Sequence, residues 1–148
     1  MSASDARALL ADFPIVAEET IRFCDMDAYG HVNNAVYLRF FESARMEYFE
    51  KIGFTVDLEQ PGIGPILAET NVRFLLPLRQ PDSVITGARI TKLDNRWFEM
   101  EYLVVSVQHA KVAAKGSGRV VVFDYATQTK AALPDAPRAA ISQLEAHT

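Results

Sequence analysis

The strongest hydrophobic pattern in the chain lies between residues 34 and 52. Its apolar positions recur every three or four residues and share one side of a helix, namely Tyr37, Phe40, Phe41, Ala44, Tyr48, Phe49 and Ile52. The polar positions fall largely on the opposite side, namely Arg39, Glu42, Ser43, Glu47 and Glu50. At about 1.5 Å per residue this helix would be roughly 28 Å long. Because its apolar face is wide, we expect a curved sheet to cradle it.

The residues at both ends of this segment fit the ends of a helix. Asn33 or Asn34 can act as N-cap, since a short polar side chain there accepts a hydrogen bond from a free backbone N–H group. Gly53 suits the position just after the helix, where the left-handed conformation is common. We therefore expect the helix to run from about Asn34 to Ile52.

The other regular stretches are mostly strand-like. Runs rich in β-branched and aromatic residues predict five strands, at about 15–24, 65–77, 82–93, 96–108 and 112–125. Turn residues at 93–96 and 108–111 join consecutive strands as hairpins. Short helices are expected at 2–12, ended by Pro14, and at Pro134–His147. One strand, a long helix and an antiparallel meander together form an α+β order.

Small residues mark one face of the last predicted strand, at Ala114, Gly116 and Gly118. Small residues in a strand let a ligand or another element approach closely, which would leave room beside the helix. A twist or bulge in the middle of this strand is the alternative, and the pattern favours neither.

The composition limits the domain organisation, the location and the partners that we expect. The chain has 148 residues, of which 49% are apolar and 23% charged, so one globular domain spanning 1–148 is expected. No apolar run approaches the roughly 20 residues of a membrane span, and the N-terminus lacks the layout of a signal peptide, so we expect no membrane association and a cytoplasmic location. The net charge of -4 argues against nucleic acid as the main partner but leaves room for a local basic patch.

Several chemistries lack support in the sequence. The single cysteine, Cys24, excludes an internal disulfide, and within a predicted strand it is expected to be a small buried residue. His31, His109 and His147 are far apart in sequence, so we predict no metal site and no cofactor. There is no nucleophile-elbow serine motif, no Walker-type glycine loop and no His-Glu-x-x-His zinc motif.

A cluster of polar residues stands directly before the predicted helix. It contains two acids, Asp25 and Asp27, followed by Gly30, His31 and two asparagines. The start of a helix has free N–H groups and favours negative charge. A carboxylate facing such donors suits hydrolysis of an activated acyl group, because one activates water or attacks while the other holds the oxyanion. The structural alternative is that these side chains only cap the turn and the helix.

This cluster resembles a known family signature. Asp25-x-Asp27, then Gly30-His-Val-Asn-Asn34, Tyr37 and Phe41-Glu-x-Ala-Arg45, is similar to the motif of hot-dog-fold acyl thioesterases. The match is to the 4-hydroxybenzoyl-coenzyme A thioesterase-like group and its acyl-coenzyme A and acyl-carrier-protein relatives. The resemblance implies a curved antiparallel sheet of about five strands around one long central helix. It also implies an acyl-coenzyme A or acyl-carrier-protein substrate, and a homodimer or homotetramer with its pocket between protomers.

The resemblance assigns roles to residues of the cluster. Asp27 would act as nucleophile toward the thioester carbonyl or as general base, and the backbone N–H of Asn34 would hold the oxyanion. Asp25 stands at alternate spacing from Asp27, and we expect it to be structural, with its side chain hydrogen-bonded to backbone in the loop. Gly30 would permit a sharp turn and close approach of the acyl group. Further substrate contacts are expected from side chains that follow it, namely His31, Asn33 and Tyr37.

The resemblance also implies sites away from the cluster. Lys92 and Arg96 would bind the nucleotide phosphates of coenzyme A, although two exposed cations at a hairpin are ordinarily just solvated. Glu42 would face the site or an interface and Glu69 would lie at an interface, whereas Glu47 is expected in solvent.

Differences from related enzymes bear on the acyl substrate and on the reaction class that the resemblance implies. Ala28 stands where the 4-hydroxybenzoyl-coenzyme A enzyme has proline, which weakens the case for an aromatic acyl group. The Asp-x4-His pair of hot-dog hydratases does not match the spacing of Asp25, Asp27 and His31. The rival hypothesis is a non-catalytic acyl-thioester-binding protein on the same fold, because fold alone does not decide activity.

Overall fold

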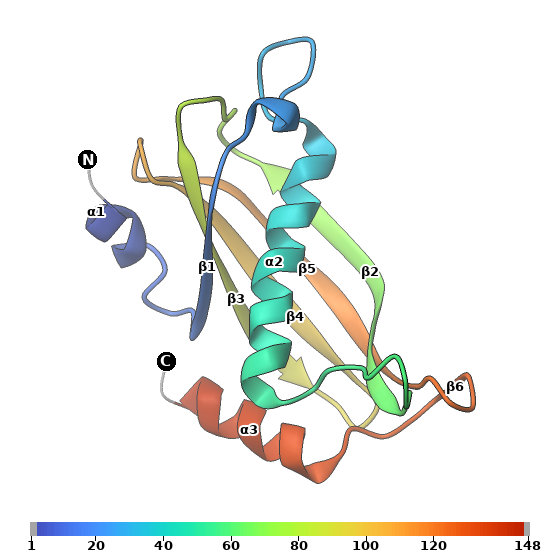
Figure 1. The fold of residues 1–148 in the computed structure, drawn as a ribbon. Helices are drawn as coiled ribbons and strands as arrows, with labels where there is room; N and C mark the ends of the chain where they lie inside the picture. The colour runs from blue at the N-terminus through green and yellow to red at the C-terminus, as the bar shows by residue number, and fades with distance from the viewer. Residues whose placement is uncertain (1–2, 147–148) are drawn as a thin grey trace.

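The computed structural model describes residues 3–146, and its centre is the long helix α2 (Asn34–Ile52). Figure 1 shows this helix lying across a sheet that curls along its length. Within residues 3–146, six strands form one antiparallel sheet in the order β1-β3-β4-β5-β2, with β6 pairing β5. The expected α+β arrangement, a curved antiparallel sheet around one long helix, is confirmed.

The strands are β1 (Ile15–Thr20), β2 (Ile63–Phe74), β3 (Ser83–Leu93), β4 (Trp97–Ser106), β5 (Lys111–Asp124) and β6 (Thr129–Lys130). The shorter helices are α1 (Ala3–Ala8), a 3-10 turn (Phe23–Asp25) and α3 (Asp135–Ala146). The two predicted hairpin turns are present between β3 and β4 and between β4 and β5. The predicted helix at Pro134–His147 is confirmed through Ala146, and its last predicted residue lies outside the described residues.

Helix α2 begins and ends where its flanking residues predict. Asn33 is the N-cap, and its Oδ1 accepts a hydrogen bond of 2.9 Å from the N–H of Ala35. Gly53 adopts φ 71°, and its N–H closes the last turn on the carbonyls of Phe49 and Glu50. These two short-range interactions set the length of the helix independently of the sheet.

The aromatic face of α2 is buried against the concave side of the sheet, as the periodicity predicts. Phe41 stacks on Tyr102 of β4 with ring centroids 4.7 Å apart. Arg45 is a polar residue on this face. Its side chain is buried and donates to the Tyr102 hydroxyl at 3.4 Å. Glu47 is exposed, as expected, and Glu42 is exposed as well.

Gly116 explains the small residues on β5. A Cβ atom there would overlap the carbonyl oxygen of Asn71 and lie 2.7 Å from the ring of Phe41. The glycine therefore makes room for the helix, which is the first of the two readings of this pattern. A bulge is also present nearby, where Ala113 is the extra residue opposite β4.

Helix α3 closes the end of the sheet where α2 finishes. Glu145 accepts hydrogen bonds from the Tyr48 hydroxyl and, at 3.0 Å, from the N–H of Ile90 beside a β-bulge. Burial and this carboxylate together raise the pKa of Tyr48. The polar end of a buried tyrosine is thus satisfied by the C-terminal helix.

The first predicted strand, 15–24, is wrong beyond Thr20. Arg22 donates its backbone N–H to the Asp25 carboxylate at 2.8 Å, which turns the chain into the 3-10 helix. Cys24 is consequently exposed, not buried in a strand. The short strand β6 was not predicted, and β2 lies at 63–74 instead of 65–77. No helix in the described part of the chain is long and apolar enough to cross a membrane.

Substituting Gly116 with alanine should destabilise the protein by about 1–3 kcal/mol, because the added methyl group forces the helix or β2 to shift. Gly62→Ala is the control, since a Cβ there meets no atom within 4 Å. Urea unfolding followed by circular dichroism measures both. Equal midpoints for the two variants would contradict the close packing at Gly116.

Candidate active site

The polar cluster before α2 folds into a tight loop. The N–H of Asp27 donates to the carbonyl of His31 at 2.9 Å, and the N–H of Gly30 returns to the carbonyl of Asp27 at 3.0 Å. Gly30 has φ 80°, a conformation that glycine adopts without steric cost. The sharp turn expected at this glycine is therefore present, and it folds the loop back toward the start of the helix.

Asp25 ties this loop to the helix. Its side chain is only 1% exposed and accepts from Arg39 of α2 through both oxygens, at 2.7 and 3.2 Å. Its own carbonyl accepts from the N–H of Asn33 at 2.8 Å. The Arg39 side chain outweighs burial and lowers the Asp25 pKa to about 2. Asp25 thus has the structural role expected from the sequence.

The Asp27 side chain has a different environment. It is partly exposed, lines a cavity and accepts one hydrogen bond of 2.9 Å, from the N–H of Tyr29 to Oδ1. This bond is the turn-capping contact of the structural alternative. Its other oxygen has no hydrogen-bond donor among residues 3–146, so the two readings of Asp27 are compatible.

The first N–H groups of α2 are not equivalent. Asn33 accepts from Ala35 through its side chain and from Val36 through its carbonyl, at 2.9 Å each. Within residues 3–146, the N–H of Asn34 has no hydrogen-bond acceptor. Asn34 also lines the cavity that contains Asp27. A carboxylate and a free helix-start donor therefore border one space.

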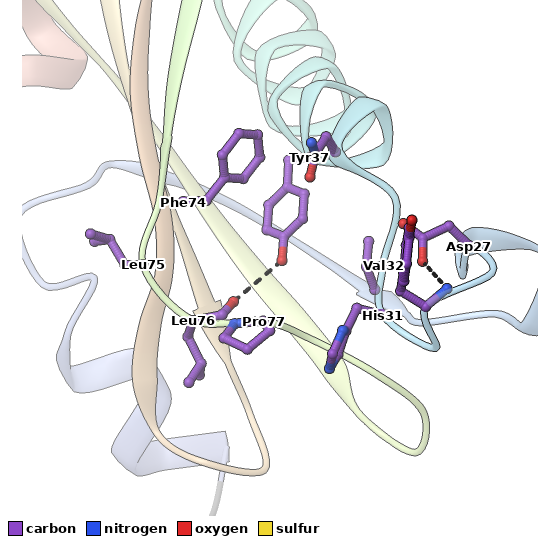
Figure 2. A pocket seen from close by; sticks show the side chains of 10 residues that line it. Asp27, His31, Val32, Tyr37, Phe74, Leu75, Leu76 and Pro77 are labelled. Atoms are coloured by element: carbon purple, nitrogen blue, oxygen red, sulfur yellow. Dashed lines mark hydrogen bonds between the residues drawn. The ribbon is translucent and has the colours of Figure 1, made fainter.

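This cavity has a volume of about 500 Å³. Figure 2 shows Tyr37 reaching from α2 toward the segment after β2, where its hydroxyl donates to the Leu76 carbonyl at 3.3 Å. Burial raises the pKa of Tyr37. The ring of Phe74 meets that of Tyr37 edge-on at 5.1 Å. The loop contributes Tyr29, His31 and Val32 to the remaining lining, and the segment at the end of β2 contributes the apolar residues Leu75, Leu76 and Pro77.

Two predicted substrate contacts lie beside the cavity instead of lining it. Gly30 and Asn33 are exposed, and the Asn33 side chain is occupied as the N-cap. Conversely, sequence reasoning missed the apolar segment 74–77 as part of the site. The sequence does contain a pattern that could have indicated this segment, namely three apolar residues and a proline at the end of a strand. Two of these side chains, Phe74 and Leu75, are 45% and 48% exposed.

Lys92 and Arg96 lie at the end of the molecule opposite the Asp27 cavity (Figure 1). Their turn contacts α3, since the Arg138 guanidinium donates to the Asp94 carbonyl at 3.0 Å, and Figure 1 shows α3 near the C-terminal end of α2. Lys92 lies over the Trp97 ring at 5.1 Å, and Arg96 is exposed. The structure therefore does not bring them to the Asp27 cavity within one protomer.

The two other acids considered for the site or an interface, Glu42 and Glu69, do not line the cavity. Glu42 is exposed and lies 3.8 Å from Arg45, and Glu69 is exposed on the edge strand β2. No group of three or more potential metal ligands from His, Cys, Asp and Glu occurs among residues 3–146, and His147 lies outside that range.

Comparison with known proteins points to one family. Residues 21–141 match the sequence model of the thioesterase-like superfamily. A thioesterase from Thermus thermophilus, crystallised with coenzyme A and zinc, is 36% identical with a TM-score of 0.80. That match covers 92% of this chain and 97% of the other.

Curated relatives include two named thioesterases. The long-chain acyl-CoA thioesterase FadM of Escherichia coli is 24% identical over 124 residues, which cover 84% of this chain and 94% of that protein. The chloroplastic acyl-acyl carrier protein thioesterase ATL3 of Arabidopsis thaliana is 28% identical over 108 residues, 72% of this chain. The match spans only 57% of the length of ATL3.

Replacing Asp25 with asparagine should lower the free energy of unfolding at pH 7 by about 1–2 kcal/mol. The Asp25 pKa is lower in the folded protein, about 2, than its ordinary 3.8, so its stabilisation is present above about pH 4 and is lost as pH falls toward 2. The difference between wild type and Asp25→Asn should shrink over that range. Thermal melting at several pH values measures it, with exposed Asp12→Asn as control. A difference independent of pH would contradict the assignment.

Proposed function

The chain belongs to the thioesterase-like superfamily, and we propose that it hydrolyses an acyl thioester of coenzyme A or acyl-carrier protein. The observation that carries the proposal is the shared cavity of Asp27 and the free N–H of Asn34. Thioester hydrolysis requires a group that activates or replaces water and a donor for the carbonyl oxygen. The relatives of this chain include acyl-CoA and acyl-carrier-protein thioesterases.

In the proposed reaction the thioester carbonyl points its oxygen at the N–H of Asn34. Asp27 acts as general base, taking a proton from a water molecule that attacks the carbonyl carbon. In the alternative, Asp27 attacks directly and forms an anhydride that water then hydrolyses. In both, the developing oxyanion is held by a donor already fixed by the helix, and the carbon–sulfur bond breaks to release a thiol and a carboxylic acid.

The surrounding residues have supporting roles in this proposal. The apolar side of the cavity, with Tyr37, Phe74 and Leu76, suits the acyl chain or the pantetheine arm. His31 lines the same cavity and offers ring nitrogens to a water molecule or to the thioester. Gly30 and Asn33 shape the site, because the backbone of the first allows the turn and the side chain of the second caps the helix.

We further propose that two copies pair along β2 and complete the site. β2 is an edge of the sheet, and an unpaired edge is a template for another strand. Large apolar side chains are exposed along it and on the neighbouring outer face of α2, namely Ile63, Ile66, Leu67, Phe74, Leu38 and Met46. Phe74 also lines the Asp27 cavity, so a partner covering this edge would border the cavity. A homodimer is the smallest assembly that covers the exposed edge strand β2.

Asp27→Asn should reduce thioester hydrolysis by roughly 10²-fold or more while preserving binding, because the amide neither accepts a proton from water nor attacks. Thiol release from short, long and aromatic acyl-coenzyme A esters measures turnover and identifies the acyl class. Asp57→Asn is a matched control, since Asp57 also accepts from a backbone N–H two residues on, at 2.9 Å, and does not line the cavity.

The same experiment separates the enzyme from its rival. Equal turnover in wild type and Asp27→Asn would remove the carboxylate from the reaction. Ester binding without turnover in either protein would favour the non-catalytic binding protein.

Leu67→Asp should convert a dimer to a monomer, because it places a charge on each side of an apolar contact that must lose water. Light scattering after size exclusion measures the mass. Leu58→Asp is the control, since Leu58 is 90% exposed in the loop before β2. A monomeric wild type, or a dimer that survives Leu67→Asp, would contradict pairing along β2.

A further inference from the structure

A second cavity adjoins the first and has a volume of about 590 Å³. The two share His31 and Pro77 as lining residues, so they lie next to each other at the loop of residues 26–33, here called the motif loop. Figure 1 shows that the motif loop, the end of β2 and the β4–β5 turn lie at the same end of the molecule. The polar lining consists of His31 from the motif loop, Arg79 and Gln80 from the connection between β2 and β3, and Gln108 and His109 from the β4–β5 turn.

The lining of this cleft contains hydrogen-bond donors and no acid. The side chains of Arg79, His31 and His109 have no hydrogen bond or ion pair with any other residue of the described range 3–146. An arginine is charged at any physiological pH and presents several donors in one plane. Three donor side chains from separate parts of the chain therefore converge without a counterion.

The acid that follows Arg79 in the chain already accepts hydrogen bonds from other donors. Asp82 is the acid closest in sequence, and its Oδ1 accepts from the N–H groups of Ser83 and Gln108 at 2.7 and 2.9 Å. Its Oδ2 accepts from the Ser106 hydroxyl at 2.5 Å. Asp82 is thus occupied in holding the β4–β5 turn, which carries His109, in place beside the cleft.

The floor of the cleft is also held in position. The Gln80 side chain donates to the Ile21 carbonyl at 3.1 Å, and its backbone N–H lies 3.5 Å from the Met26 sulfur. These contacts join the segment that carries Arg79 to the residues just before Asp27. A ligand in the cleft is consequently placed at a defined position relative to the proposed reacting carboxylate.

We propose that this cleft binds a phosphate of the thiol carrier. This inference rests on the proposed function, because coenzyme A and acyl-carrier protein both end their pantetheine arm in a phosphate. Arginine and imidazole donors suit phosphate oxygens, and hydrogen bonds between charged partners are about twice as strong as neutral ones. This cleft is separate from the turn that carries Lys92 and Arg96, because that turn lies at the other end of the molecule (Figure 1).

Calorimetric titration of the wild-type protein with pantetheine, 4′-phosphopantetheine and coenzyme A tests the proposal. The phosphorylated ligands should bind roughly tenfold more tightly than pantetheine. Arg79→Gln should abolish that difference and leave pantetheine binding unchanged. Lys130→Gln, an exposed cation on β6, should behave as wild type.

The possible results of this titration either support or overturn the phosphate site. Equal affinity of wild type for pantetheine and both phosphorylated ligands, or a phosphate preference that survives Arg79→Gln, would overturn the proposal. A preference lost in Arg96→Gln instead would overturn it too, and would place the phosphate at the β3–β4 turn. Dependence on Arg79 for coenzyme A but not for 4′-phosphopantetheine would support the cleft with a nucleotide phosphate as its ligand. Because binding is measured without turnover, a protein that binds phosphate here but hydrolyses no ester would contradict only the proposed function.

Discussion

The aromatic face of α2 has to be buried along the length of the helix, and the sheet curls because of it. Each large apolar side chain removed from water contributes about 1.5–3 kcal/mol, and Phe40, Phe41 and Tyr48 are fully buried here. β5 accommodates the closest approach with Gly116. Since helix and sheet are held in register by this packing, the N-terminus of α2 always emerges at the same end of the sheet. The site is built at that end.

Two carboxylates two residues apart then take different roles because their surroundings differ. Asp25 is buried and bonded to Arg39, an arrangement that keeps its pKa low and binds the loop to the helix. Asp27 stands outward from the same loop and borders a cavity. Burial with a charged partner makes the first acid a structural anchor, whereas partial exposure leaves the second accessible to a ligand and to water.

The site consists of two adjoining hollows, one with an apolar side and the other with a cationic side chain. Tyr37 and Phe74 border the cavity on one side of the motif loop, and Arg79 and His109 border the cleft on the other. His31 and Pro77 belong to both. An acyl thioester has the same division, with an apolar chain, a central reactive carbonyl and an anionic carrier.

The sequence by itself determined what depends on near neighbours. The limits of α2 follow from Asn33 and Gly53, its buried face follows from helical spacing, and the motif places Asp27 next to a helix start. Local pattern was wrong at Cys24, because a hydrogen bond from Arg22 to Asp25 turns the chain where strand-like residues continue. Only the tertiary structure decided which distant segments meet. The strand order brings residues 74–80 and the β4–β5 turn to the motif loop and carries Lys92 and Arg96 away from it, because strand pairing joins residues far apart in the sequence, which local periodicity does not record.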